Sequence, residues 1–181
     1  MRILSSEEGQ EWLTLNLWNQ LTERSLRREF SQRVSYLLPA DAGKKTGLAR
    51  RLTASVDYTG EGLLWIDAWG IWPSCENMRL FPAYRKSLRE ERPLQDAPFH
   101  VFTEPDSHDV ECLLDLALYF FWDVIVLEGS RSKAVRISHD EYIDLYARNH
   151  EGLAVFENSF SGLDLKVITE GKPSSGTAGV P

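Results

Sequence analysis

The stretch Leu63-Leu64-Trp65-Ile66-Asp67-Ala68-Trp69-Gly70-Ile71 decides the fold class. Successive side chains of a β-strand point to opposite faces of its sheet. Here the odd-numbered positions are apolar apart from Asp67, and the even-numbered positions are apolar or small. A strand that is apolar on both faces belongs inside a sheet that is covered on both sides. Residues 63–71 therefore predict a central strand between two layers.

Helical and strand patterns alternate on both sides of this stretch. The apolar spacing and the capping residues predict these elements: helices at about 5–18, 48–56, 74–88, 107–121 and 138–149, and strands at about 28–38, 63–71, 99–102, 122–128 and 134–137. The order predicts an α/β or α+β fold. We expect a single domain with a central mixed sheet of about five strands, covered by about five helices.

Length and composition set the organisation of the chain. The 181 residues, 43% of them hydrophobic, match one globular domain, which we place at 1–170. Residues 171–181 are rich in Gly, Pro and Ser and predict a flexible tail. Two cysteines do not make a disulfide scaffold, and no stretch has the apolar character of a signal peptide or a membrane span. We therefore expect a cytoplasmic protein without membrane association.

The net charge of −7 is unevenly distributed. Residues 21–92 carry 13 Lys and Arg against nine Asp and Glu, whereas residues 93–170 carry five against 15. An acidic chain does not favour nucleic-acid binding, which depends on Lys and Arg at phosphates. If the fold separates the two stretches, the acidic one would attract a protein with a basic face. If the fold interleaves them, their charges cancel.

Cys75 is a candidate nucleophile. It follows Ser74 near the predicted start of a helix, where free backbone N–H groups stabilise a thiolate. With a histidine as base it would form the core of a hydrolase or transferase. The alternative is that Ser74 caps the helix and Cys75 is a small buried side chain.

His139 is the other candidate for acid–base chemistry, because it lies in Ser138-His139-Asp140-Glu141. The Ser138 to Glu141 spacing also fits a capping box, which needs no ligand. None of the spacings typical of metal sites occurs in the chain, and Gly43-Lys44-Lys45-Thr46 lacks the first glycine of a phosphate loop. We expect no metal and no cofactor.

Two carboxylates stand in apolar surroundings. Asp67 lies between Trp65 and Trp69, and Asp123 follows the most apolar predicted helix. A carboxylate in such a place must be paired, hydrogen-bonded or protonated. Arg33 and Arg79 are candidate partners in a structural ion pair. The alternative is that Asp67 is a functional carboxylate at the mouth of a pocket walled by tryptophans.

A binding surface is predicted where the central strand ends. Trp72 follows the strand, and Trp and Arg are enriched among the residues that dominate protein interfaces. We expect Trp72 with Arg79 or Arg85 to anchor a partner, together with Asp123.

The sequence favours a non-catalytic domain that binds another protein, as immunity or antitoxin proteins do by analogy only. One alternative is a small hydrolase or transferase that uses Cys75 or Asp67 with a histidine. The other is a ligand-binding regulatory subunit with a pocket under the tryptophan-rich strand.

Overall fold

The computed structural model describes residues 1–18, 20–69 and 75–168, without the side chains of 75–78. Its elements are β1 (Arg2–Leu4), α1 (Ser6–Leu15), α2 (Glu23–Glu29), β2 (Gln32–Leu37), α3 (Ala42–Ser55), β3 (Gly62–Ala68), α4 (Cys75–Ser87), η1 (Leu94–Asp96), β4 (Phe99–Phe102), η2 (Glu104–Asp106), α5 (Ser107–Phe120), β5 (Asp123–Leu127), β6 (Lys133–Ser138), β7 (Tyr142–Ala147) and α6 (His150–Ser159). The mixed α/β class is confirmed. Among the described residues there are more strands than expected, seven in one sheet.

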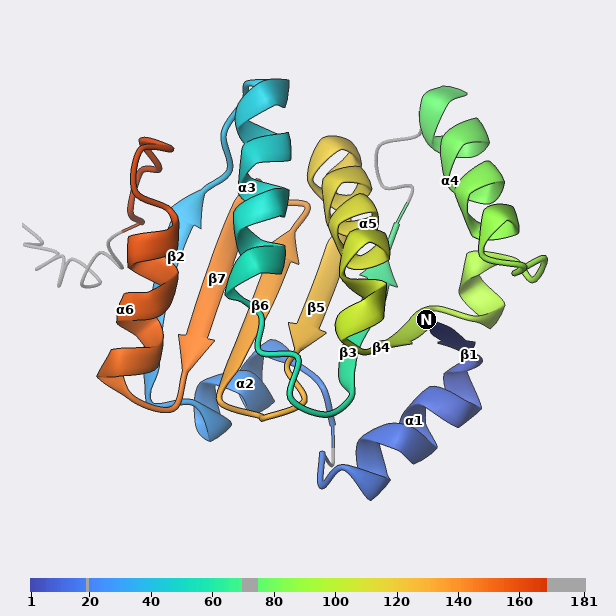
Figure 1. The fold of residues 1–181 in the computed structure, drawn as a ribbon, viewed down its shortest axis with the longest axis horizontal. Helices are drawn as coiled ribbons and strands as arrows, with labels where there is room; N and C mark the ends of the chain where they lie inside the picture. The colour runs from blue at the N-terminus through green and yellow to red at the C-terminus, as the bar shows by residue number, and fades with distance from the viewer. Residues whose placement is uncertain (19, 70–74, 169–181) are drawn as a thin grey trace, which may run out of the picture.

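The strands follow the order β1-β4-β3-β5-β6-β7-β2. Each named pair in the described part of the chain is antiparallel, so the sheet is not mixed as expected. The connections between β2 and β3 and between β4 and β5 carry helices across the sheet, whereas β5, β6 and β7 follow one another as hairpins (Figure 1).

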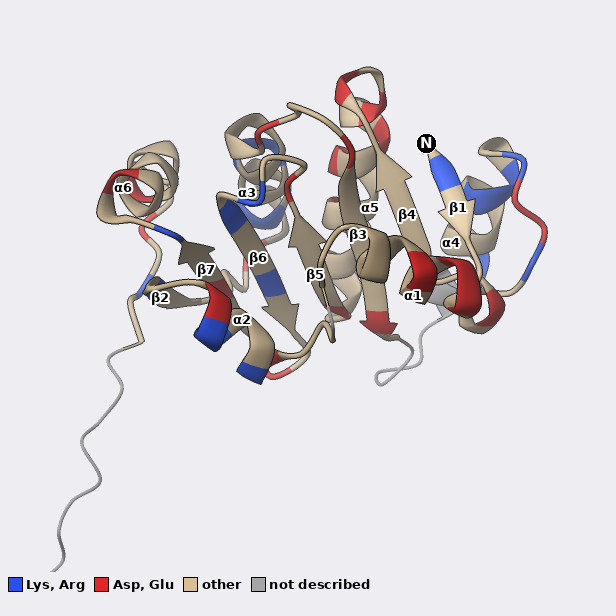
Figure 2. Ribbon diagram, turned by 90° about the horizontal axis from the view of Figure 1, so that it is seen from below, with Lys and Arg blue, Asp and Glu red and all other residues tan. Residues whose placement is uncertain are grey.

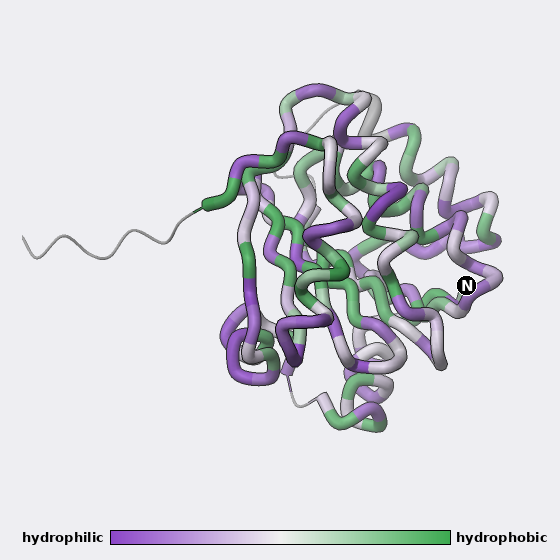
Figure 3. The backbone as a smooth tube through the Cα atoms, turned by 60° about the vertical axis from the view of Figure 1, so that its left-hand side comes forward, coloured by the Kyte–Doolittle hydropathy of each residue, from purple (hydrophilic) through white to green (hydrophobic). Residues whose placement is uncertain are grey.

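Helices cover both faces of the sheet. Figure 2 shows α3, α5 and α6 on one side of the strands and α2 on the other. We call the first side the α3–α5 face; its core contains Leu64 and Ile66 of β3 and Phe81 of α4. We call the second the α1–α2 face; its core contains Leu63 of β3 and residues of α1 and α2. Hydrophobic and hydrophilic residues alternate along much of the chain, as Figure 3 shows, which is the pattern of elements with one buried and one exposed side.

The central position of β3 confirms the prediction from residues 63–71. The strand lies between β4 and β5, and Leu63, Leu64 and Ile66 are at most 1% exposed. Burying large aliphatic side chains on both faces contributes about 1.5–3 kcal/mol for each residue. From Leu63 to Ile66, the side chains on both faces of the strand therefore pack into the two cores.

The register between β3 and β5 shifts between Ile66 and Ala68. This bulge inserts one residue and moves the following side chains to the other face. Trp65, before the bulge, stacks on Phe99 in the core of the α1–α2 face, with ring centroids 5.3 Å apart. Trp69 packs on the α3–α5 face against Phe81, at 6.3 Å. The prediction that the two tryptophans share a face is wrong.

The predicted helix at 138–149 is also wrong. Residues 133–138 and 142–147 form the hairpin β6–β7, joined by a tight turn in which Glu141 N–H donates to the Ser138 carbonyl at 3.1 Å. Glu141 takes a positive φ of 65°. Ser138 and Glu141 therefore end one strand and begin the next, and they do not form a capping box.

Candidate functional site

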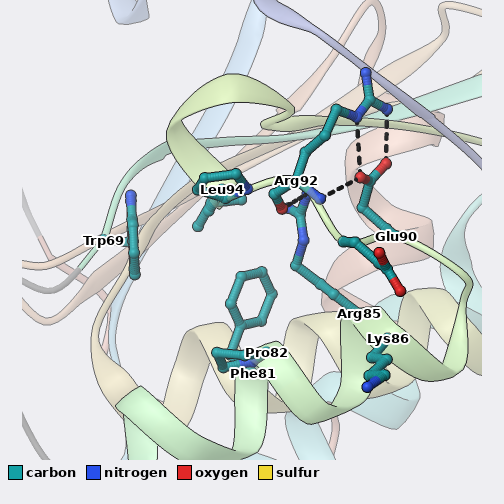
Figure 4. A pocket seen from close by; sticks show the side chains of 10 residues that line it. Trp69, Phe81, Pro82, Arg85, Lys86, Glu90, Arg92 and Leu94 are labelled. Carbon is teal, nitrogen blue, oxygen red and sulfur yellow. Dashed lines mark hydrogen bonds and ion pairs between the residues drawn. The ribbon is translucent and has the colours of Figure 1, made fainter.

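A pocket of about 510 Å³ lies between α4, the segment 88–97 and Trp69. We call it the Arg85 pocket. The described residues that line it are Trp69, Phe81, Pro82, Arg85, Lys86, Glu90, Glu91, Arg92, Pro93 and Leu94. Trp69, Phe81 and Leu94 lie toward one end, and the charged groups of Arg85, Glu90 and Arg92 toward the other (Figure 4). The volume is in the range of natural small-molecule sites.

The spacing of residues on α4 builds the inner wall. Phe81 is 2% exposed and packs edge-on against the buried Trp122, with centroids 4.8 Å apart. Arg85 is one helical turn later, so it lies on the same side of the helix. Its guanidinium carbon is 5.4 Å from the centre of the Phe81 ring. The core contact of Phe81 therefore fixes the place of Arg85.

Arg85 is a buried cation, only 2% exposed. Its two terminal nitrogens donate to main-chain carbonyls, one to Ala97 at 3.0 Å and the other to Arg92 at 3.1 Å. These bonds hold the segment 88–97 against α4. The Nε–H group has no hydrogen-bond partner in the part of the chain that the structure describes. Burial lowers the pKa of Arg85, because the charge has lost water without gaining a paired carboxylate among the described residues.

The nearest acid is already engaged. Glu90 accepts from Arg92 Nε at 2.9 Å and Nη2 at 2.6 Å, as the dashed lines in Figure 4 show. This bidentate contact lowers the pKa of Glu90 to about 2. Arg92 also donates to the carbonyl of Ile3 at 2.9 Å. Glu90 is therefore paired with Arg92, and Arg85 is left without an ion-pair partner among the described residues.

Other unpaired polar groups lie around the same wall. His100 in β4 lies between its register partners Ile3 in β1 and Leu64 in β3 and is fully buried. Neither ring nitrogen has a hydrogen-bond partner among the described residues. Burial and the positive Arg85 lower its pKa to about 3, so the ring is neutral. Trp122 Nε1, beneath Phe81, has no partner either. Of the five buried unpaired side-chain atoms in the described part of the chain, four belong to Arg85, His100 and Trp122. Buried polar groups are usually satisfied, so their clustering here is informative.

A second cluster joins three residues that the sequence singled out separately. Asp123 Oδ1 accepts from the backbone N–H of His139, and Oδ2 lies 2.8 Å from His139 Nδ1. Asp67 lies nearby and keeps much of its surface in solvent. The loss of part of its hydration and the negative Asp123 raise the pKa of Asp67. The two bonds to His139 fasten the end of β6 to the start of β5. This arrangement accounts for Asp123 as a support for the hairpin.

The buried ion pair predicted for Asp67 involves another residue. Arg33 pairs with Asp144 at 2.8 Å, and Asp144 is fully buried. Ser35 Oγ donates to the same carboxylate at 2.5 Å and Arg136 lies 3.3 Å from it. The sequence pattern does not single out Asp144, because it predicts a helix over 138–149, where β7 forms instead.

The remaining predicted site residues lie apart. Arg79 is exposed on α4 and is not among the described residues that line the Arg85 pocket. Trp72 and the side chain of Cys75 lie outside the described residues, as do residues 171–181. Sequence reasoning missed the role of the segment 88–97, whose charged run carries no motif.

Two further findings apply to the residues that the structure describes. No three His, Cys, Asp or Glu side chains there are arranged to hold a metal ion. No helix there combines the length and the apolar character needed to cross a membrane. Comparisons of the chain with protein-family models, with curated proteins and with solved structures found no match.

Proposed function

We propose that the protein is a non-catalytic binding domain that holds a small organic molecule in the Arg85 pocket. One observation carries the proposal: a pocket of about 510 Å³ combines an apolar end with a buried arginine whose Nε–H has no hydrogen-bond partner among the described residues. Natural ligand sites have this character, with apolar walls and few polar groups. This is the ligand-binding alternative that the sequence left open.

The charge distribution favours this proposal over an acidic docking face. Ion pairs join the basic stretch 21–92 to the acidic stretch 93–170: Arg33 with Asp144, Arg50 with Glu111, and Lys44 with Asp164. The fold explains the first two pairs, because β2 lies beside β7 and α3 packs against α5. Some of the basic residues of the first stretch are therefore balanced locally by acidic residues of the second.

Trp65 and Trp69, which pack on opposite faces of the sheet, provide a test. Calorimetry should measure the binding of 1-naphthoate, a probe of suitable size with an apolar body. We expect Trp69→Ala to weaken binding at least tenfold, because it removes a pocket wall. Trp65→Ala is the matched control on the opposite face, and we expect it to leave affinity unchanged once folding is verified. Equal losses for both variants, or no binding by the unmodified protein, would contradict the proposal.

A protein partner is the second candidate, favoured by the outer side of α1. Leu15 and Leu17 are 75% and 77% exposed, and Glu7 and Glu11 precede them on the exposed side of the helix. A partner with basic and apolar groups would complement this surface. A partner isolated with this chain should be lost on the double change Glu7→Lys and Glu11→Lys. It should be kept when exposed Glu151 and Glu157 of α6 are changed in the same way; equal retention by both variants would contradict the surface.

A further inference from the structure

Arg85 differs from the other buried charged residues of the described chain because one of its donor groups has no hydrogen-bond partner there. Glu128 pairs with Lys133 at 3.0 Å, and Asp144 pairs with Arg33. Lys45 places its Nζ 3.7 Å from the centre of the Phe121 ring. Arg85 has two main-chain acceptors, a ring 5.4 Å away and an unpaired Nε–H. A buried guanidinium without a carboxylate is costly, and a bound anion would offset that cost.

The rim of the pocket limits how many negative charges a ligand can carry. Lys86 and Arg92 add positive charge there, but Glu90 and Glu91 line the same pocket. Glu90 is neutralised by Arg92, and Glu91 is exposed. With Glu90 paired to Arg92, the charged lining residues that remain are Arg85 and Lys86 against Glu91. One negative charge on a ligand balances this excess, whereas a phosphate dianion would exceed it. The pocket therefore favours a monoanion.

The opposite end of the pocket fits an apolar body. Trp69 and Phe81 form two of its walls, and Leu94 forms a third (Figure 4). Phe81 is held from behind by Trp122 and flanked by Trp69, so its ring position is set before a ligand enters. Aromatic walls held in this way bind flat apolar groups with little loss of side-chain freedom.

We propose, on the basis of the proposed function, that the ligand is a small monocarboxylate with a flat apolar body. Its carboxylate is held at the Arg85 end of the pocket, and its body lies against Trp69 and Phe81. The carboxylate supplies the negative charge that Arg85 lacks among the described residues, and the segment 88–97 lines the pocket beside it.

The test compares probes of one shape and different charge. Calorimetry with the unmodified protein should give 1-naphthoate an affinity at least about tenfold above that of neutral 1-naphthamide, because hydrogen bonds to charged groups are the stronger ones. The dianion 1-naphthyl phosphate should bind more weakly than 1-naphthoate. Equal affinity of acid and amide, or tighter binding of the phosphate, would overturn the ligand class and leave the proposed function standing. Binding of none of the three would overturn both.

Variants of α4 assign the preference to Arg85. Arg85→Gln should abolish the preference for acid over amide, and Arg85→Lys should keep part of it. Arg79→Gln, the same change at an exposed position of the same helix, should keep the full preference. If Arg85→Gln does not fold, the acid-to-amide ratio of the unmodified protein and of Arg85→Lys decides. An undiminished preference in folded Arg85→Gln would overturn the assignment.

Discussion

His100 shows how one buried side chain costs stability on the strand beside the Arg85 pocket. Its ring is fully buried, neither nitrogen has a hydrogen-bond partner within the described ranges, and its pKa is lowered to about 3. Leaving a buried polar group unpaired costs about 1–3 kcal/mol. We expect His100→Leu to raise the free energy of unfolding at pH 7 by about 1 kcal/mol, measured by urea denaturation.

The same residue predicts a pH dependence. The unfolded chain binds a proton at the ordinary histidine pKa of 6.5, whereas the folded protein does so only near 3. Protonation of the unfolded chain therefore lowers the free energy of unfolding as the pH falls from about 6.5 toward 3, with a slope of at most about 1.4 kcal/mol per unit. The advantage of His100→Leu should grow over this range. His100→Gln, which is polar but does not titrate, should remove the pH dependence without the gain at pH 7; a pH-independent difference would contradict a neutral His100.

The sequence patterns identify several important residues but do not show which of them lie close together. Asp67, Asp123 and His139 were each selected, but their meeting depends on β3, β5 and the β6–β7 turn lying side by side. Arg85 was selected as an anchor for a protein, whereas its burial depends on the core contact of Phe81. Such facts follow from tertiary packing, which local patterns do not report.

Helix α1 packs closely on the sheet at Gly9. A Cβ at Gly9 would lie 2.3 Å from the ring of Phe99, which itself stacks on Trp65. Overpacking costs about 1–3 kcal/mol, more than the roughly 1 kcal/mol that alanine contributes to a helix. We expect Gly9→Ala to lower the free energy of unfolding.

Gly47 in α3 is the matched control for this prediction. The nearest atom to its Cβ position is Leu163 Cδ2 at 3.4 Å, an ordinary contact. Gly47→Ala should therefore stabilise the protein by about 0.5–1 kcal/mol. Stabilisation by Gly9→Ala of the same size would show that α1 does not pack closely on Phe99.

Elements with a long, consistent pattern were predicted well. The central strand, the buried helix at 107–121 and the capping box at Ser5 all occur, the last two as α5 and the start of α1. The failure at 138–149 has a physical reason. Tyr142, Ile143, Leu145 and Tyr146 suit one side of a helix, but pairing with β6 and β2 on both edges satisfies the backbone and buries both faces of β7.

The order of the strands in the whole molecule determines which charged residues meet and where the Arg85 pocket lies, and local sequence patterns do not report that order. Pairing of β2 with β7 brings Arg33 to Asp144, and packing of α3 against α5 brings Arg50 to Glu111. A net charge counted along the chain therefore says little about the surface. The same order puts β4 near the edge, where α4 and the segment 88–97 meet and the Arg85 pocket opens.

The most direct test of this pocket as a ligand site is an NMR titration of the ¹⁵N-labelled protein with 1-naphthoate. We predict that the Arg85 Nε–H and Trp69 indole N–H signals shift together and saturably, while the Trp65 indole signal stays in place. Binding that leaves the Arg85 and Trp69 signals unmoved, or shifts that are spread evenly over the chain, would contradict the account.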